Sequence, residues 1–214
     1  MNDKSRASYV RLAPDNRRAA LIHAARTCIA EGGIAAFNVD QVCAQAGVSR
    51  GLVTHHFGSM NALLASVYQH AHAVSMPVLA DLPRDWPLIL SVLDHLFAPG
   101  IFNRQSLNVW LTLWARISNH PDLRDIHRTH YRAYHQMIAA ALHEAGLGVQ
   151  QAGTLAQSLT CLIDGLGLQH CIDPESMPSQ VARQSCTALL AHHIPTLADP
   201  VIQSVSRLTG INLI

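Results

Sequence analysis

The chain has 214 residues, of which 49% are hydrophobic and 14% charged, so it is long enough for one large domain or two small ones. The hydrophobic fraction excludes a disordered chain, because it supplies enough apolar surface to offset the entropy lost on folding. The formal net charge of +1 indicates no polyanionic partner by itself. However, residues 1–72 carry seven basic and four acidic side chains and the remainder eight basic and ten acidic ones, an asymmetry that nucleic-acid binders show.

The five cysteines are scattered and never spaced as Cys-x-x-Cys, which predicts reduced thiols and neither a disulfide framework nor a zinc site. The first 18 residues lack the apolar core of a secretory signal. The stretch between Arg50 and Asp81 has no Asp, Glu, Lys or Arg, but histidine, asparagine, glutamine and proline interrupt it, which argues against a membrane span. We therefore expect a cytoplasmic protein without a membrane partner.

Helix signals dominate the sequence, and no stretch alternates apolar and polar side chains as a half-buried strand would. Proline and glycine residues divide the chain at helix-length intervals, which predicts an all-α fold of about nine helices. The first four predicted helices cover residues 15–31, 39–46, 50–56 and 61–75. The Gly32-Gly33 pair is predicted to end the first of them.

The second and third predicted helices have the signals of a helix-turn-helix. Asn38 is a good N-cap for the second helix and Gln41 stands three residues later, which is a capping-box arrangement. Gly47 suits the left-handed conformation that ends this helix, and Ser49 is predicted to cap the next one.

Small and apolar side chains fall where these two helices must pack, namely Val42, Cys43, Ala46, Val48 and Val53. The third helix then turns Arg50, Thr54 and His55 outward. Donors at the N-terminus of such a helix can grip phosphate while longer side chains reach base edges in the major groove. From spacing alone, a packed helical hairpin without a DNA role remains an alternative.

Residues 38–57 read NVDQVCAQAGVSRGLVTHHF, and the pair Leu63-Leu64 follows. Ala-Gly-Val-Ser, then Gly, then His-His-Phe at this spacing resembles the N-terminal domain of TetR/AcrR transcriptional regulators. The resemblance covers about residues 15–70, a third of the chain, and agrees with the predicted helix-turn-helix. It implies that the chain binds DNA.

The resemblance also implies roles for individual residues. The positions where relatives contact DNA are occupied here by Ser49, Arg50, Thr54, His55 and His56. Asn38 and Gln41 lie where relatives approach a phosphate, and Phe57 is implied to be a core anchor.

Two departures from the family pattern weaken the implied phosphate contacts. Thr54 stands where many members have a phosphate-binding tyrosine, and Met60 stands where they have a lysine. Affinity would then depend on Arg17, Arg18 or the basic side chains of the arm formed by residues 1–14. That arm either follows the minor groove or is a solvated, disordered tail.

The C-terminal two-thirds resembles the BetI-like branch of the family, which includes choline-responsive repressors. The similarity lies in the segment WLTLWA that begins at Trp110, in a proline-started helix over residues 121–146, and in LIDGL at residues 162–166. It is spread thinly, so the ligand is not inherited from it. We expect a flexible arm at 1–14, a helix-turn-helix domain at 15–60, and a helical ligand-binding and dimerisation domain at 61–214.

One helical face carries Leu107, Trp110, Leu111, Trp114 and Ile117 at three- and four-residue spacing. Such a stripe is either core packing or the wall of a ligand pocket. Because aromatic faces attract quaternary ammonium groups, the candidate cage for a cationic ligand is Trp110, Trp114, Tyr131 and Tyr134. Asp164, embedded in an apolar helix, either balances that charge or is a hydrogen-bonded structural carboxylate.

Five of the 14 histidines fall around one helix, and His127 and His130 are three residues apart. No third ligand follows at a recognisable spacing, so a solvated polar face is preferred to a metal site. Arginine and histidine here are equally compatible with an anionic ligand. We expect no cofactor.

Two late segments, about residues 150–171 and 178–193, are apolar almost all round, which predicts burial in a homodimer, with burial inside one chain as the alternative. Gly153, Gly165 and Gly167 predict a close helix approach in the first of them. The apolar residues 199–214 are expected to dock as an extra helix.

We therefore expect a homodimeric, ligand-responsive transcriptional regulator, most simply a repressor, that binds a double-stranded, pseudo-palindromic operator and is released by a small molecule. No motif of a catalytic site is present in the sequence, so an enzyme is not expected. The alternative is a helical small-molecule-binding protein or enzyme without DNA recognition.

Overall fold

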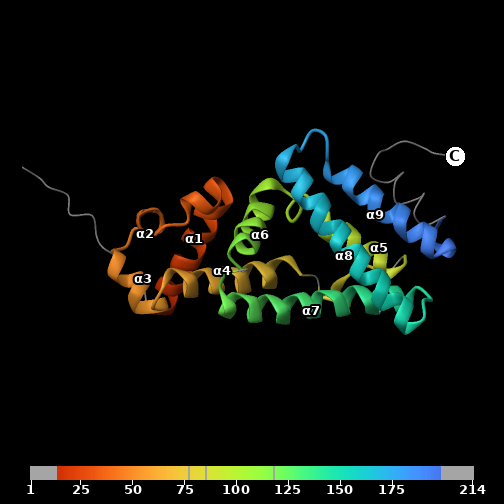
Figure 1. The fold of residues 1–214 in the computed structure, drawn as a ribbon, viewed down its shortest axis with the longest axis horizontal. Helices are drawn as coiled ribbons and strands as arrows, with labels where there is room; N and C mark the ends of the chain where they lie inside the picture. The colour runs from red at the N-terminus through yellow and green to blue at the C-terminus, as the bar shows by residue number, and fades with distance from the viewer. Residues whose placement is uncertain (1–13, 77, 85, 118, 199–214) are drawn as a thin grey trace, which may run out of the picture.

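The computed structural model describes residues 14–76, 78–84, 86–117 and 119–198. Those residues form nine α-helices and two 3₁₀ turns and contain no strand, which confirms the predicted all-α fold (Figure 1). The helices are α1 (Pro14–Ala36), α2 (Val39–Ala46), α3 (Arg50–Phe57), α4 (Met60–Ser75), α5 (Leu88–Leu96), α6 (Arg104–Ile117), α7 (Pro121–Glu144), α8 (Val149–Ile172) and α9 (Ser179–His193), with the 3₁₀ turns η1 (Leu79–Asp81) and η2 (Pro195–Leu197). The expectations for residues 1–13 and for the tail at 199–214 lie outside the described residues.

The range of α1 includes a break at the predicted glycine pair. The backbone leaves the helical region at Gly33, with φ 62° and ψ −152°, and a further turn then runs to Ala36. The positive φ explains why a glycine is needed at this kink, since other residues rarely adopt it. The regular helix therefore ends at the glycine pair, as predicted, and the residues up to Ala36 form a separate short turn after the kink.

Helices α1 to α4 pack around a core whose largest side chains are completely buried, including Leu21, Ile29, Leu63 and Leu64. Val109 and Leu113 of α6 belong to the same core. The Asn108 side chain of α6 also donates a hydrogen bond of 3.2 Å to the backbone carbonyl of Ala30. The N-terminal helices are thus joined to α6 by apolar packing and by a polar contact.

A second core lies in the C-terminal half around α5, whose apolar residues Ile89, Leu90, Val92 and Leu93 are all fully buried. Helices α7, α8 and α9 contribute the remaining side chains, including Ile138, Leu159 and Leu190. Figure 1 shows α2 and α3 near one end of an elongated molecule and α8 and α9 near the other, with α4, α6 and α7 between them. None of the helices in the described part of the chain is long and apolar enough to cross a membrane.

Candidate functional site

The predicted helix-turn-helix is formed by α2, the turn at Gly47, and α3. Asn38 caps α2 by accepting a 3.0 Å hydrogen bond from the backbone N–H of Gln41. Gly47 has φ 64° and ψ 35°, and the next N–H, that of Val48, reaches back to the carbonyl of Cys43 at 3.0 Å. This left-handed closure places the start of α3 beside α2.

Two details of the predicted caps are wrong. Ser49 flanks α3 but makes no side-chain capping hydrogen bond, so its hydroxyl is not used by the helix. The N–H of Asn38 bonds to the backbone carbonyl of Ala36, and no hydrogen bond from the Gln41 side chain to Asn38 completes the capping box in the described residues. The helices still begin where predicted, because the preceding backbone is extended at both positions.

The buried and exposed faces of the helix-turn-helix follow the predicted pattern. Val42, Cys43 and Val53 are buried between the helices, while Ala46 and Val48 are half-buried. Most of the residues with implied DNA contacts lie on the exposed side: Asn38, Gln41, Ser49, Arg50, Thr54 and His55 are exposed, and His56 and Arg17 are half-buried. The guanidinium of Arg50 lies beside the Asp40 carboxylate, with Nε 2.5 Å from Oδ1.

Arg18, in contrast, is engaged in structural contacts. Its Nη2 donates a 3.1 Å hydrogen bond to Ser66 in α4, and its guanidinium lies 4.6 Å from the centre of the Phe57 ring. These contacts tie α1 to α3 and α4. Of the two neighbouring arginines, Arg17 is therefore the better candidate for a DNA contact.

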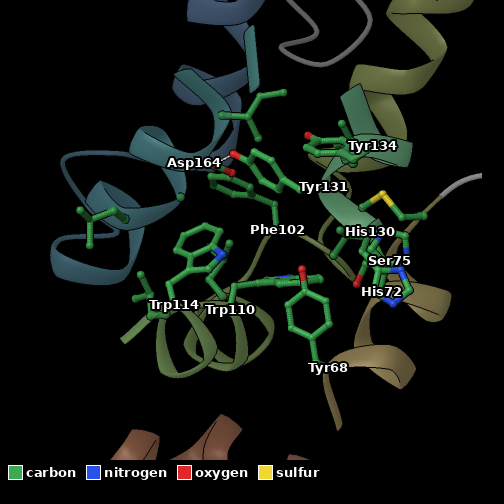
Figure 2. Close-up of a pocket in the computed structure, with 18 residues that line it drawn as sticks. Tyr68, His72, Ser75, Phe102, Trp110, Trp114, His130, Tyr131, Tyr134 and Asp164 are labelled. Carbon is green, nitrogen blue, oxygen red and sulfur yellow. Dashed lines mark hydrogen bonds between the residues drawn. The ribbon is translucent and has the colours of Figure 1, made fainter. Parts of the chain in front are cut away.

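A pocket of about 780 Å³, including the part open to solvent, lies between α4, α6, α7 and α8. All five residues that the sequence singled out as candidates for ligand binding line it: Trp110, Trp114, Tyr131, Tyr134 and Asp164 (Figure 2). The stripe on α6 is thus divided, since Leu107 and Leu111 also line the pocket while Ile117 packs against the N-terminal core.

The acidic side of the pocket is formed by Asp164. The Tyr131 hydroxyl donates a hydrogen bond to Oδ2 of this carboxylate, as the dashed line in Figure 2 shows. Burial raises the pKa of Asp164 to about 6, although the bond from Tyr131 acts in the opposite direction. Among the described residues, no lysine, arginine or histidine forms an ion pair with Asp164. At neutral pH the pocket therefore contains a largely ionised carboxylate without a cationic partner.

The opposite side of the pocket carries Tyr68 and His72, which the sequence analysis missed, and His130, which it expected on a solvated polar face. The His72 and His130 rings lie 4.2 Å apart, and the Tyr68 hydroxyl is 3.0 Å from Nδ1 of His127. Burial lowers the pKa of each of these three histidines, and the charge of His130 lowers the pKa of His72 and His127 further. Neutral imidazoles therefore face the acidic side across an apolar space.

One atom on this side has no hydrogen-bond partner: Nε2 of His72 is buried and unsatisfied in the structure. Such an atom is costly unless a ligand or water satisfies it. In the part of the chain that the structure describes, no group of three or more histidine, cysteine, aspartate or glutamate side chains that could hold a metal ion occurs around His127 and His130 or elsewhere.

Aromatic rings connect the two sides of the pocket. The Tyr68 ring meets Trp110 edge-on at 5.5 Å, and Tyr131 lies 6.2 Å from Tyr134. Burial raises the pKa of all three tyrosines, so their hydroxyls stay neutral hydrogen-bonding groups. The pocket combines ring faces, one carboxylate and neutral donors, a set that suits an organic cation better than an anion.

Comparisons with known proteins agree with this geometry. Residues 21–67 match the family model described as bacterial regulatory proteins, tetR family, and residues 88–195 match the model described as BetI-type transcriptional repressor, C-terminal. The BetI 1 regulator of Chromohalobacter salexigens is 27% identical over 175 residues, covering 78% of this chain and 85% of that protein. The BetI regulator of Burkholderia mallei is 28% identical over 173 residues, covering 78% and 87%.

Solved structures show the same fold. A transcriptional regulator from Pseudomonas aeruginosa PAO1 superposes with a TM-score of 0.74 at 26% identity, covering 91% of this chain and 98% of that one. A regulator from Saccharomonospora viridis, solved in complex with choline, gives a TM-score of 0.71 at 22% identity, covering 84% and 98%.

These relatives are transcriptional regulators rather than enzymes. The two family models together span the helix-turn-helix and the part of the pocket formed by α6, α7 and α8. The chain therefore belongs to the tetR family of bacterial regulatory proteins, as a DNA-binding, ligand-responsive transcriptional regulator whose C-terminal region is of the BetI repressor type.

Proposed function

We propose that the protein is a homodimeric repressor whose two α3 helices, one from each subunit, dock into successive major grooves of its operator. The proposed DNA contacts are Asn38, Gln41, Ser49, Arg50, Thr54, His55, His56 and Arg17. Two-fold symmetry requires half-sites separated by about one helical turn, roughly 34–36 Å, or a multiple of it, so the operator is an imperfect palindrome. Because the DNA of a bacterial cell lies in the cytoplasm, we expect the protein to act there.

Residues 15–60 are the proposed DNA-binding unit, and residues 61–214 the proposed ligand-binding and dimerisation unit. The chosen boundary falls at the start of α4, which also carries Tyr68 into the pocket. A ligand that moves α4 would therefore move the neighbouring α3. The ligand can weaken DNA binding only as far as it prefers the released state, so a tenfold loss needs about 1.4 kcal/mol of coupling.

The proposed effector is an organic cation, and the observation that carries this proposal is the half-buried Asp164 carboxylate in the apolar pocket. A charge in such surroundings is costly unless a partner compensates it, and no cation of the described residues does so. Ring faces of Trp110, Trp114 and Tyr134 would stabilise an ammonium group beside it. The choline bound to the Saccharomonospora viridis regulator supports this class of ligand.

The proposed dimer interface is the open face of α8 together with α9. This face carries Leu168 and Ile172 of α8 and Val181 of α9, whose exposed fractions are 41%, 67% and 41%. Of the three glycines for which a close helix approach is expected, Gly167 meets a neighbour among the described residues of one subunit, where an added Cβ would lie 3.1 Å from Leu107. Gly153 and Gly165 have no atom of these residues within 4 Å of an added Cβ, which leaves room for a second subunit. A second subunit would cover these apolar positions.

The dimer is tested by light scattering on Ile172→Arg, because Ile172 is the most exposed apolar residue of this face and does not line the pocket. Val74→Arg is the matched control, since Val74 is an exposed apolar residue of α4 outside α8 and α9. A dimeric control and a monomeric Ile172→Arg protein are expected. Two dimeric variants would contradict the proposed interface.

The regulatory function is tested by gel shift with the DNA upstream of the gene, at several salt concentrations, with choline and with its neutral isostere 3,3-dimethylbutan-1-ol. Binding that weakens steeply with salt is expected, because phosphate contacts release counterions. Release by choline but not by the neutral alcohol would support a cationic effector. Absence of salt-dependent DNA binding would favour a small-molecule-binding protein without DNA recognition.

A further inference from the structure

The charged side chains of the helix-turn-helix are unusually few. Between Gly32 and Ala80, Asp40 and Arg50 are the only residues among Asp, Glu, Lys and Arg. Histidines aside, α2 and α3 therefore carry no net charge. Attraction to the phosphate backbone dominates non-specific DNA binding. In these two helices, histidines aside, Arg50 is the one side chain whose charge provides this attraction.

The fold brings these two charges together. Asp40 is the second residue of α2 and Arg50 the first of α3, and the turn at Gly47 sets the helices so that Nε of Arg50 lies 2.5 Å from Oδ1 of Asp40. The side chains are 72% and 57% exposed for Arg50 and Asp40, respectively. The pair is thus on the surface that carries the proposed DNA contacts, not under it.

Stability does not account for this pair. Exposed ion pairs contribute little, because solvent and salt screen them and because two long side chains lose freedom. The helices are already fixed by the apolar contacts of Val42, Cys43 and Val53. The consequence of the ion pair lies instead in the conformation of the Arg50 side chain.

Asp40 contacts Arg50 at Nε. This contact leaves the two terminal amino groups of Arg50 free to bind a base. Guanine offers O6 and N7 in the major groove as a pair of acceptors, and arginine binds them with two of its N–H groups. When Nε faces the carboxylate, both terminal amino groups remain for the base. An arginine held in this way has already lost part of its side-chain conformational entropy, so less entropy is lost when it binds DNA.

We propose, on the basis of the proposed function of α3, that Asp40 is a positioning residue that makes Arg50 read a guanine: it holds the guanidinium through Nε, and its negative charge opposes binding of Arg50 to phosphate alone. Asp40 contributes specificity at the expense of non-specific affinity. Its removal changes these two quantities in opposite directions.

The test selects preferred sites from a pool of randomised duplex DNA with the full-length wild type, Asp40→Asn and Arg50→Ala. The matched control is Glu144→Gln, which removes one charge from the exposed Arg84–Glu144 ion pair at the end of α7. Affinity for duplex of random sequence is measured in parallel. Wild type and control are expected to select the same palindrome with a guanine in each half-site.

For Asp40→Asn we expect the preference for that guanine to fall about tenfold, at the base pair where Arg50→Ala also loses it. We also expect affinity for random DNA to rise about two- to fivefold, since a charge that repels phosphate is gone. An unchanged motif in Asp40→Asn, or a loss of both specific and random-sequence affinity, would overturn the inference. Failure of the wild type to select any motif would instead overturn the proposed function.

Discussion

The N-terminal and C-terminal regions each contain an arginine–aspartate ion pair, and the surroundings of the two pairs are opposite. Arg50 and Asp40 are largely exposed on the helix-turn-helix, with 72% and 57% of their side chains accessible. Arg183 and Asp94 join α9 to α5 and are 3% and 34% exposed, with Nε and Nη2 of the arginine 2.7 Å and 2.5 Å from one carboxylate oxygen.

The difference separates two uses of charge. Water screens the exposed pair, so it adds little stability, and its proposed effect is to orient Arg50, the side chain that we propose reads DNA. In the second pair the arginine is buried and the carboxylate is partly buried, so removing the arginine leaves the carboxylate in surroundings where hydration compensates its charge poorly. Asp164 is intermediate between them: it is half-buried, Tyr131 donates a hydrogen bond to its carboxylate, and no ion pair of the described residues includes it, which is why we propose a cationic ligand as its partner.

The largest effect predicted from this comparison is the loss of stability when Arg183 is replaced. Arg183→Ala should reduce the free energy of unfolding by about 2–4 kcal/mol, because a buried side chain and its ion pair with the partly exposed Asp94 are both lost. Asp40→Ala should change it by less than about 1 kcal/mol. For a chain of this size, Arg183→Ala then corresponds to a fall in Tm of roughly 4–16 °C. Thermal unfolding checks both, and equal losses in the two variants would contradict the distinction between the pairs.

The next largest effect is expected at Asp164. Asp164→Asn keeps the size of the side chain and removes its charge, so affinity for a cationic ligand such as choline should fall by about 2–3 kcal/mol, or roughly 30- to 150-fold. Calorimetry with choline measures this loss, and binding of the variant to DNA without ligand serves as its control. Similar choline affinities in both proteins would exclude Asp164 as the cation partner.

The pH dependence of ligand binding sharpens the same point. Because the pKa of Asp164 is about 6 in the folded chain, protonation below pH 6 should reduce cation affinity by up to about tenfold per pH unit. His72 and His130 face the same pocket, and their lowered pKa values mean that they gain charge in this range too. The comparison with Asp164→Asn separates the two contributions, since only the histidine contribution remains there.

The sign of the stability change provides an independent check. The folded chain binds the Asp164 proton more tightly than the unfolded chain, whose pKa lies near 3.8. The contribution to stability is therefore fully present below pH 4 and is lost as the pH rises through 6. Wild type should lose stability relative to Asp164→Asn over this window, and parallel curves would show that the pKa of Asp164 is not raised.

Sequence reasoning succeeded where the signal is local. Asn38 and Gly47 define α2 through a cap and a left-handed turn, so its bounds were predicted correctly. The tryptophans of α6 and the isolated carboxylate of Asp164 stand out from their helices, and all of them line one pocket. Each of these residues differs in type from its neighbours in the sequence, so the sequence of a single segment is enough to identify it.

Contacts between distant segments could not be predicted in this way. Tyr68 and His72 lie on α4 with the spacing of ordinary core residues, and only the crossing with α6 and α7 turns them toward the pocket. The bond from Arg18 to Ser66 joins residues 48 apart, without a sequence signal. The Asp40–Arg50 pair had a signal that sequence analysis did not use, namely their isolation as the only charges across two helices.

The smallest effect is expected at Arg17, the half-buried arginine of α1 that sequence analysis assigned to the phosphate backbone. Arg17→Ala should weaken binding by a few-fold, about equally for the operator and for random DNA, and should lower the number of counterions released on binding by about one per subunit. Its neighbour provides the contrast, since Arg18→Ala removes the interactions with Ser66 and Phe57 and should lower Tm. A change of base preference in Arg17→Ala would show that this side chain reads sequence, and Arg50 would then no longer be the sole arginine that determines specificity.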